Sequence, residues 1–279
     1  TASLAGTITT SNFTTFSDFV IGNVNWVFNG DFRSVTDGNW NTASTWETYN
    51  STTGTWVAAT GTPTSANNVY IQDEDSVVLT ANAACKDLHL NSDITQGDVG
   101  RINTQNFTLA IHGKIRGYSG AKGNIPGATA SNAHNSSAFI TTGVSGKIQF
   151  TGTTRDVMVS GEWASPTNNF GWNLEFAMNS ATDTAKINTN LRAGSITIAS
   201  GVVQQVAGGP KPDNGAAGTG TFTINSGATY ITSSTGLFRT ASDRFGVFNL
   251  NSGGNYVIPS SFSVSPNLAA ATVNLNGTI

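Results

Sequence analysis

The chain has 279 residues, of which 10% are charged, and its formal net charge at pH 7 is −3. Ordinary globular proteins carry roughly 25% charged residues, whereas Thr, Ser, Asn and Gly fill most polar positions here. The scattered Lys and Arg residues form no basic stretch for a nucleic acid, and no apolar run approaches the ~20 residues needed to span a bilayer. No window repeats apolar residues at helical spacing over several turns, so we expect an all-β fold.

The first 65 residues differ in kind from the rest of the chain. Three of the six tryptophans, Trp40, Trp46 and Trp56, stand close together in this region, and one end of a stacked β structure needs an aromatic cover for its core and strand edges. We therefore predict a Trp-rich cap over 24–65. Residues 1–23 form a separate strand segment, whose apolar positions are Ile8, Phe13, Phe16, Phe19 and Ile21.

From residue 66 to residue 279, pairs of apolar residues two positions apart recur before a turn. The segments SITIASG, TFTINSG, VFNLNSG and TVNLNGT begin at residues 195, 221, 247 and 272, so the repeat is 25 or 26 residues long. A fixed period with alternating inward residues predicts a parallel β-helix, or solenoid, of about nine coils. The nine pairs are Val69/Ile71, Leu88/Leu90, Leu109/Ile111, Ile148/Phe150, Leu174/Phe176, Ile196/Ile198, Phe222/Ile224, Phe248/Leu250 and Val273/Leu275.

Turn-forming residues separate the apolar pairs of this repeat. Asn225 and Asn251 each follow an apolar pair, and we expect such Asn residues to form side-chain ladders at the corners. Two stretches rich in Gly, Pro and Ser, near 117–137 and 206–220, are predicted to leave the solenoid as loop insertions.

Two stretches of the chain resemble a known family. The first is DGNWNTASTWE at 37–47, followed by TPTSANNVYIQDEDSVVLTANAACKDLHL at 62–90, and the second is SNFTTFSDFVIGN at 11–23. The stretch at 37–90 is similar to the string that opens β-solenoid domains in secreted, adhesin-like surface proteins of Bacteroidota exported by the type IX (gliding-associated) system. The stretch at 11–23 resembles the closing segment of such domains. This resemblance implies an extracellular or cell-surface location.

The closing segment stands before the opening one, an order that suggests two arrangements. The chain is either a window of a longer tandem array or a subunit whose open end is completed by the start of another copy. In the second case Ile8, Phe13, Phe16, Phe19 and Ile21 would supply strands to a neighbour and build a head-to-tail filament. The alternative is that this segment folds back on its own cap.

Carboxylates are the first candidates for chemistry. Asp73, Glu74 and Asp75 form the densest cluster and are weak candidates for Ca²⁺, which takes about six to eight oxygen ligands. The cluster lacks EF-hand spacing, so a solvated turn is the favoured interpretation.

Cysteine and histidine residues suggest no metal or nucleophile site. Cys85 is the single cysteine and is expected to pack in the core, and the three histidines, His89, His112 and His134, follow no zinc-ligand spacing. We find no catalytic constellation and therefore predict neither an enzyme nor a cofactor.

Aromatic residues are the candidates for sugar binding. Trp40, Trp46, Trp56 and Tyr118 could stack on pyranose rings, although a role as the core of the cap is favoured for the tryptophans. Ser76 and Thr184 follow Asp and precede an apolar residue, which resembles the O-glycosylation acceptor of Bacteroidota.

The sequence thus favours an extracellular structural or adhesive surface protein, with a self-assembling filament subunit as its most specific form. Its expected partners are copies of itself or adjacent repeats of a longer chain, and glycans. The alternative is a carbohydrate-binding or polysaccharide-processing β-helix protein.

Overall fold

A computed structural model describes residues 27–91, 100–118, 139–140, 146–158, 173–187, 190–206, 209–212, 219–232, 245–259 and 272–279. Within these residues every regular element is a strand, except for one 3-10 helix, η1 (Ala43–Thr45). The prediction of an all-β protein is therefore confirmed. The strands form five sheets, in which parallel pairing predominates.

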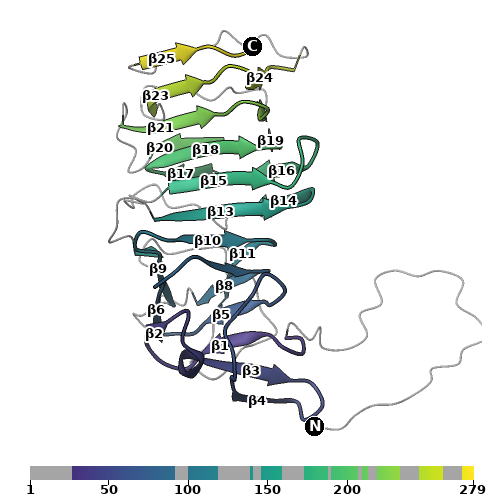
Figure 1. Ribbon diagram of the computed structural model, residues 1–279, viewed down its shortest axis with the longest axis vertical. Helices are drawn as coiled ribbons and strands as arrows, with labels where there is room; N and C mark the ends of the chain where they lie inside the picture. The colour runs from purple at the N-terminus through teal and green to yellow at the C-terminus, as the bar shows by residue number, and fades with distance from the viewer. Residues whose placement is uncertain are drawn as a thin grey trace, which may run out of the picture.

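The largest sheet has eight strands, and each pair of neighbours in it is parallel. Figure 1 shows most of these strands as rungs that follow one another along the long axis of the molecule. Their order is β7 (Ala83–Cys85), β10 (Thr108–Ile111), β13 (Lys147–Gly152), β15 (Asn173–Met178), β18 (Ser195–Ser200), β21 (Thr219–Ile224), β23 (Phe245–Leu250) and β25 (Thr272–Leu275).

A six-stranded sheet and a four-stranded sheet accompany the first part of the chain. The six-stranded sheet has the order β11 (Ile115–Tyr118), β8 (Leu88–Asn91), β5 (Val69–Ile71), β1 (Phe32–Ser34), β3 (Trp46–Asn50) and β4 (Thr55–Ala58). Its antiparallel pairs are β1–β3 and β3–β4. The four-stranded sheet has the order β12 (Phe139–Ile140), β9 (Arg101–Asn103), β6 (Ser76–Val78) and β2 (Gly38–Asn39).

Two smaller parallel sheets accompany the later strands. One has the order β14 (Arg155–Met158), β16 (Thr184–Ile187), β19 (Val202–Gln205), β22 (Thr229–Ile231) and β24 (Asn255–Val257). The other pairs β17 (Asn190–Ala193) with β20 (Gly209–Pro212). Successive strands belong to the sheets in a repeating order. β5, β6 and β7 lie in the six-, four- and eight-stranded sheets, in that order. The next three strands, β8 to β10, repeat this order, and so do β11 to β13.

Rows of apolar side chains run across the eight-stranded sheet and form the core. Ile196, Phe222 and Phe248 pair in register on β18, β21 and β23, and all three are fully buried. The rings of Phe222 and Phe248 are stacked, with centroids 5.9 Å apart. Alternate residues of a strand point to the same side, so a repeat that keeps the register places equivalent side chains one above another at about 4.8 Å.

Two of the nine predicted pairs belong to a different sheet from the others. Val69/Ile71 and Leu88/Leu90 pair with each other in the six-stranded sheet, whereas Leu109 and Ile111 pair with Ala83 and Cys85 of β7. The alternating pattern is the same on both sheets, and Ala83 gives β7 a weak apolar signal. Stacking of the nine pairs as one series is therefore wrong for its first two members.

Both predicted insertions contain residues that form strands. Gly117 and Tyr118 complete β11, and residues 209–212 of the second stretch form β20 beside β17. β20 contains Pro210 and Pro212, and it lies at the edge of its sheet, where missing backbone donors are tolerated. Residues 119–137, 207–208 and 213–218 lie outside the described residues.

Truncation of one core ring should be costly. Phe222→Ala removes a buried ring that stacks on Phe248, and we expect the free energy of unfolding to fall by about 3–5 kcal/mol. Urea unfolding measures this loss. Thr197→Ala on the outward side of β18 is the control and should change stability by no more than about 0.5 kcal/mol. Equal effects of the two variants would contradict the assignment of the core side.

Candidate functional site

Exposed large apolar side chains gather at the two ends of the long axis. Phe28, in a turn bonded to β3, is 59% exposed, and Val57 of β4 is 40% exposed. At the opposite end, which carries β24 and β25 in Figure 1, Val257, Leu275 and Ile279 are 39%, 46% and 58% exposed. Val206, which follows β19, is the one large apolar side chain of comparable exposure among the described residues that lies along the side. We name the end with β24 and β25 the open end.

β25 is the outermost strand at the open end. It pairs with β23 on one side, and no other described strand pairs with its second side. Leu275 continues the row of Ile198, Ile224 and Leu250, which are fully buried, but Leu275 itself is half exposed. Each member of this row is covered by the strand that follows, so the row becomes accessible at β25.

A hollow of about 550 Å³ lies beside β24 at the open end. The backbone of Thr278 bonds β24 on one flank, since it accepts from the Tyr256 N–H at 2.9 Å and donates to the Gly254 carbonyl at 3.0 Å. Val257, one residue further along β24, is accessible. The edge of β24 is therefore partly covered and partly open. The hollow is lined by Thr229, Asn255, Tyr256, Val257, Ile258, Thr278 and Ile279.

The opposite end is closed by packed tryptophans and an antiparallel hairpin, β3–β4. Trp40 and Trp46 are each 1% exposed, and their rings meet edge to face with centroids 5.2 Å apart. The Trp46 Nε1–H donates to the Trp40 carbonyl at 2.8 Å. These two rings form the core of this end and have no free face on which a sugar could stack.

Asp31 ties this closed end to the first parallel strands. Its carboxylate accepts from the Phe28 backbone N–H at 2.8 Å and from both the backbone N–H and Nδ2 of Asn68 at 3.3 Å. Asp31 is only 3% exposed, and this burial raises the pKa of its carboxyl above the ordinary 3.8.

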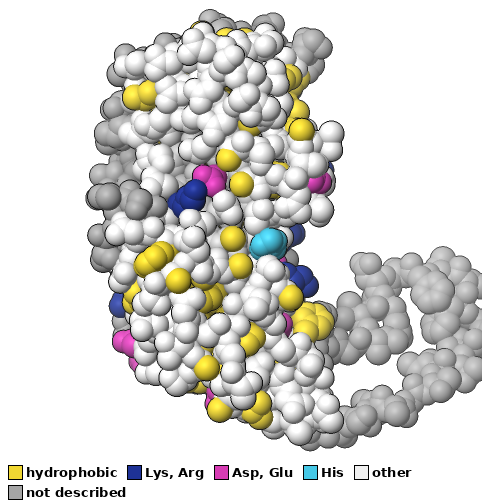
Figure 2. Space-filling view, in the orientation of Figure 1, with side chains coloured by type: hydrophobic (Ala, Val, Ile, Leu, Met, Phe, Trp, Pro, Cys, Tyr) yellow, Lys and Arg dark blue, Asp and Glu magenta, His cyan; other side chains and the backbone are white. Residues whose placement is uncertain are grey.

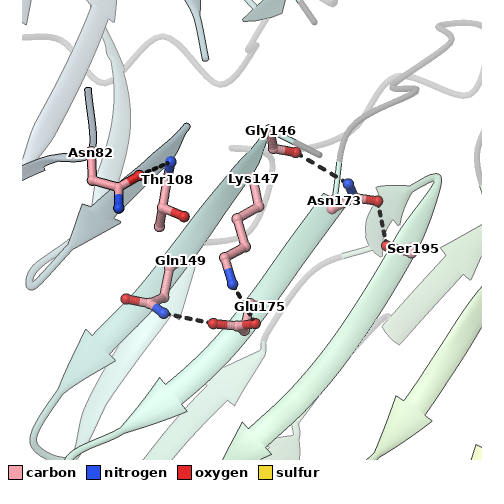
Figure 3. Close-up of polar contacts among 8 residues, drawn as sticks. All are labelled: Asn82, Thr108, Gly146, Lys147, Gln149, Asn173, Glu175 and Ser195. Atoms are coloured by element: carbon pink, nitrogen blue, oxygen red, sulfur yellow. Dashed lines mark hydrogen bonds and ion pairs between the residues drawn. The ribbon is translucent and has the colours of Figure 1, made fainter. Parts of the chain in front are cut away.

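The outward face of the eight-stranded sheet is polar and mostly uncharged. Lys147 and Gln149 both bond Glu175, at 2.7 and 2.6 Å, so this ion pair joins β13 to β15 (Figure 3). The Ser195 hydroxyl bonds Asn173 Oδ1 at 2.5 Å on the next pair of strands. Figure 2 shows charged side chains only as isolated spots on the visible face. Polar side chains therefore join neighbouring strands on the outside as apolar rows do inside.

Asparagine ladders occur where the sequence predicts them. Asn251 Nδ2 donates to Asn225 Oδ1 at 2.9 Å, and Asn274 Nδ2 donates to Asn249 Oδ1 at 2.7 Å. In each pair the two residues lie about one repeat apart in the sequence. The expectation of side-chain ladders is confirmed for Asn225 and Asn251, whereas Asn249 and Asn274 lie within β23 and β25 between two apolar residues.

Trp56 is the accessible member of the predicted sugar-stacking set. It is half-buried on β4, with the Arg33 guanidinium 4.8 Å from its ring centroid and the Tyr49 ring centroid at 5.3 Å. Arg33 is in turn held by Glu47 through an Nε–H bond of 2.8 Å. The Tyr118 backbone pairs with Asn91, while its side chain lies outside the described part of the structure.

The predicted calcium candidates lie in a turn that is more buried than we expected. Asp73 and Asp75 are 5% and 1% exposed, and only Glu74 faces solvent. Asp75 accepts a hydrogen bond from the Ser34 hydroxyl at 2.6 Å, which anchors this turn to β1. No three His, Cys, Asp or Glu side chains of the described residues are grouped so that they could hold a metal ion. A fully solvated turn is therefore wrong for the two aspartates.

The predicted glycosylation acceptors lie in strands. Ser76 and Thr184 are half-exposed on β6 and β16, and their backbone N–H groups donate to Asp37 Oδ1 at 2.6 Å and Thr154 Oγ1 at 3.0 Å. The five predicted assembly residues, Ile8, Phe13, Phe16, Phe19 and Ile21, lie outside the described residues.

Cysteine and histidine residues are spread apart. Cys85 is fully buried on β7, which confirms the expected packing role. His89 is 5% exposed and stacks on Tyr70 at 4.4 Å, whereas His112 is exposed after β10. His134 lies outside the described residues. The histidine–tyrosine stack is a contact that the spacing of residues in the sequence does not reveal.

Comparison with protein-family models, curated proteins and solved structures found no match to this chain. In the described part of the chain, no helix has the length and apolar character that crossing a membrane would need.

The buried carboxyl of Asp31 should make stability depend on pH. Since its pKa is higher in the folded state than the ordinary 3.8, the contribution of Asp31 to stability is fully present below pH 3.8 and is lost as the pH rises through the raised value. We expect the free energy of unfolding of the wild type, minus that of Asp31→Asn, to fall over this window. Urea unfolding of both proteins at a series of pH values measures the difference. A difference that grows with pH would contradict the raised pKa.

Proposed function

We propose that this chain is a structural module of an extracellular or cell-surface protein, in which a parallel β-solenoid extends by adding strands at its open end. The observation that carries this proposal is the exposed end of the apolar row at Leu275, on the strand β25 whose second edge no described strand pairs. An incoming strand would bury that side chain and pair that edge. The partner is a second copy or an adjacent repeat.

The repeating order of strands among the sheets supports the solenoid. A chain that passes through three sheets and returns to the first, one rung further on, brings each sheet one new parallel strand per turn. From β18 to β25 the strands of the eight-stranded sheet recur every 25 or 26 residues, with strands of the five-stranded sheet between them, so each repeat again adds one rung. In this arrangement each coil contacts chiefly its two neighbours. The solenoid can therefore lengthen by further coils that pack in the same way.

The N-terminal segment is the proposed donor strand. Ile8, Phe13, Phe16, Phe19 and Ile21 supply the apolar side chains that an uncovered row requires. The described chain begins at residue 27, close to the closed end and far from β25 in Figure 1. A strand that leaves from that end can reach the open end of a second copy, which gives a head-to-tail contact.

A surface location and an adhesive role are supported by composition and by the resemblance to type IX secreted proteins of Bacteroidota. The outward face of the eight-stranded sheet carries mainly Thr, Ser, Asn and Gln, and its charged residues Lys147 and Glu175 neutralise each other. Such a face remains soluble without strong electrostatic attraction to polyanions. A long rod with such a face suits an adhesive or display role at a surface better than catalysis.

Deletion of residues 1–23 should abolish self-association without unfolding the sheets. The deletion removes the proposed donor and no residue of the described core. Sedimentation velocity and electron microscopy of the full chain and the deletion variant measure association, and circular dichroism measures the fold. A folded deletion variant that still forms end-to-end assemblies would refute strand donation.

A matched pair of substitutions tests the acceptor in the same experiment. Leu275→Asp places a charge in the row that the donor would cover, and it should abolish association. Val206→Asp makes the same change at an exposed apolar residue on the side and should leave association intact. Equal self-association of the two variants would show that the open end takes no part in the contact.

Carbohydrate binding is the second candidate function, and Trp56 is the observation that favours it. Its half-buried ring lies beside Arg33 and Glu47, which supply polar groups next to an aromatic surface, as sugar sites require. If this function is correct, Trp56→Ala should lose binding to an immobilised neutral polysaccharide, whereas a substitution at Val206 should not. Unchanged retention of Trp56→Ala would exclude this site.

A further inference from the structure

Two neighbouring strands of the eight-stranded sheet, β18 and β21, share a short sequence signature. β18 contains Ser195-Ile196-Thr197 and β21 contains Thr221-Phe222-Thr223, so a hydroxyl residue stands on each side of a buried apolar residue. The two strings pair residue by residue in parallel. Glycine precedes both of them, at Gly194 and Gly220.

The glycine in this signature has a structural cause. Gly220 has a φ of +71°, and a Cβ placed there would lie 2.4 Å from the Gly194 carbonyl oxygen. At β13 the equivalent Gly146 would bring a Cβ within 1.9 Å of the Gln105 carbonyl oxygen. The backbone of one turn approaches the next so closely at this corner that a side chain is excluded.

The same string occurs once more, in the proposed donor segment. Residues 6–9 read Gly-Thr-Ile-Thr, which matches the signature of β18 and β21 at every position. Other strands that follow a glycine have different flanking residues: β9 has Arg101 and Asn103, β11 has Lys114 and Arg116, and β19 has Val202 and Gln204. Within the eight-stranded sheet itself, β13 reads Gly146-Lys147-Ile148-Gln149, so among the described strands the string is confined to β18 and β21. Residues 6–9 themselves lie outside the described residues.

We infer that Gly6–Thr9 of a second copy forms the next parallel strand beyond β25, with Thr7 beside Thr272, Ile8 beside Val273 and Thr9 beside Asn274. This inference rests on the proposed head-to-tail function and specifies its pairing. The register continues that of β23 and β25, in which Val247, Phe248 and Asn249 pair with Thr272, Val273 and Asn274. Ile8 then extends the row of Ile196, Phe222 and Phe248.

The contact at β25 also explains the exposure of Leu275. In the inferred register Thr10 follows Ile8 by two positions and lies over Leu275, where its β-branched side chain covers part of the exposed surface. Thr9 would continue the outward polar ladder in which Asn274 bonds Asn249 at 2.7 Å. The donor thus supplies Ile8 and the methyl group of Thr10 on the inward side and Thr9 on the outward side.

Cysteine cross-linking tests the register. The native Cys85 is fully buried, so introduced cysteines supply the accessible thiols. Thr9→Cys combined with Asn274→Cys should form intermolecular disulfides under mild oxidation, because residues opposite each other on neighbouring strands lie about 4.8 Å apart, within the Cα range of a disulfide. Thr10→Cys with Asn274→Cys is the matched control, since a shift of one residue turns the side chain to the other face.

The readout is a ladder of covalent oligomers on a non-reducing gel, with association measured beforehand by sedimentation under reducing conditions. We expect the ladder from Thr9→Cys/Asn274→Cys and its loss in the control. Thr7→Cys with Thr272→Cys repeats the test at a second outward pair and should also give a ladder.

The outcomes separate the two proposals. If the variants associate in a manner that requires residues 1–23 but cross-link equally in both registers, or only in the control, the inferred pairing is overturned while the proposed function stands. If the wild type does not associate, both proposals fail.

Discussion

The structure depends on the stacking of equivalent apolar side chains on parallel strands. Ile196, Phe222 and Phe248 are each buried because the strand on either side repeats the same chemistry in the same register. A single strand of four to six residues buries little surface alone, so the stability of any one rung comes from its neighbours. The hydrogen-bonded asparagine and glutamate contacts on the outside maintain the same register without adding to the core.

This dependence on neighbours makes the two ends chemically special. At one end two buried tryptophans and an antiparallel hairpin cover the last apolar row. At the other end Leu275 of β25 is accessible although Ile198, Ile224 and Leu250 of the same row are buried, and Val257 is accessible beside the hollow at β24. The proposed function follows from this difference, because strand edges and uncovered apolar rows are the features through which β structures join.

The sequence predicts much of the core and little of the polar contacts. The 26-residue spacing of Ile196, Phe222 and Phe248 predicts their stacking, because a fixed period and an alternating pattern leave one arrangement that buries all three. The pattern does not separate the sheet of Leu88 from the sheet of Leu109, since both show the same alternation. The burial of Asp75 and the ring stack of His89 on Tyr70 depend on residues distant in sequence, and no local signal marks them. The burial of Trp40 and Trp46 in the cap is expected from the sequence, whereas their edge-to-face contact with each other follows only from the packing.

The direction of the hydrogen bonds has a mechanical consequence. The strands of the eight-stranded sheet lie across the long axis, so the bonds between them run along it (Figure 1). A tensile load applied from end to end would pull these bonds open one rung at a time, as in unzipping, instead of loading many of them at once in shear. A long surface fibre built from such rungs would therefore yield gradually and lengthen under force, rather than resisting to a single high breaking point.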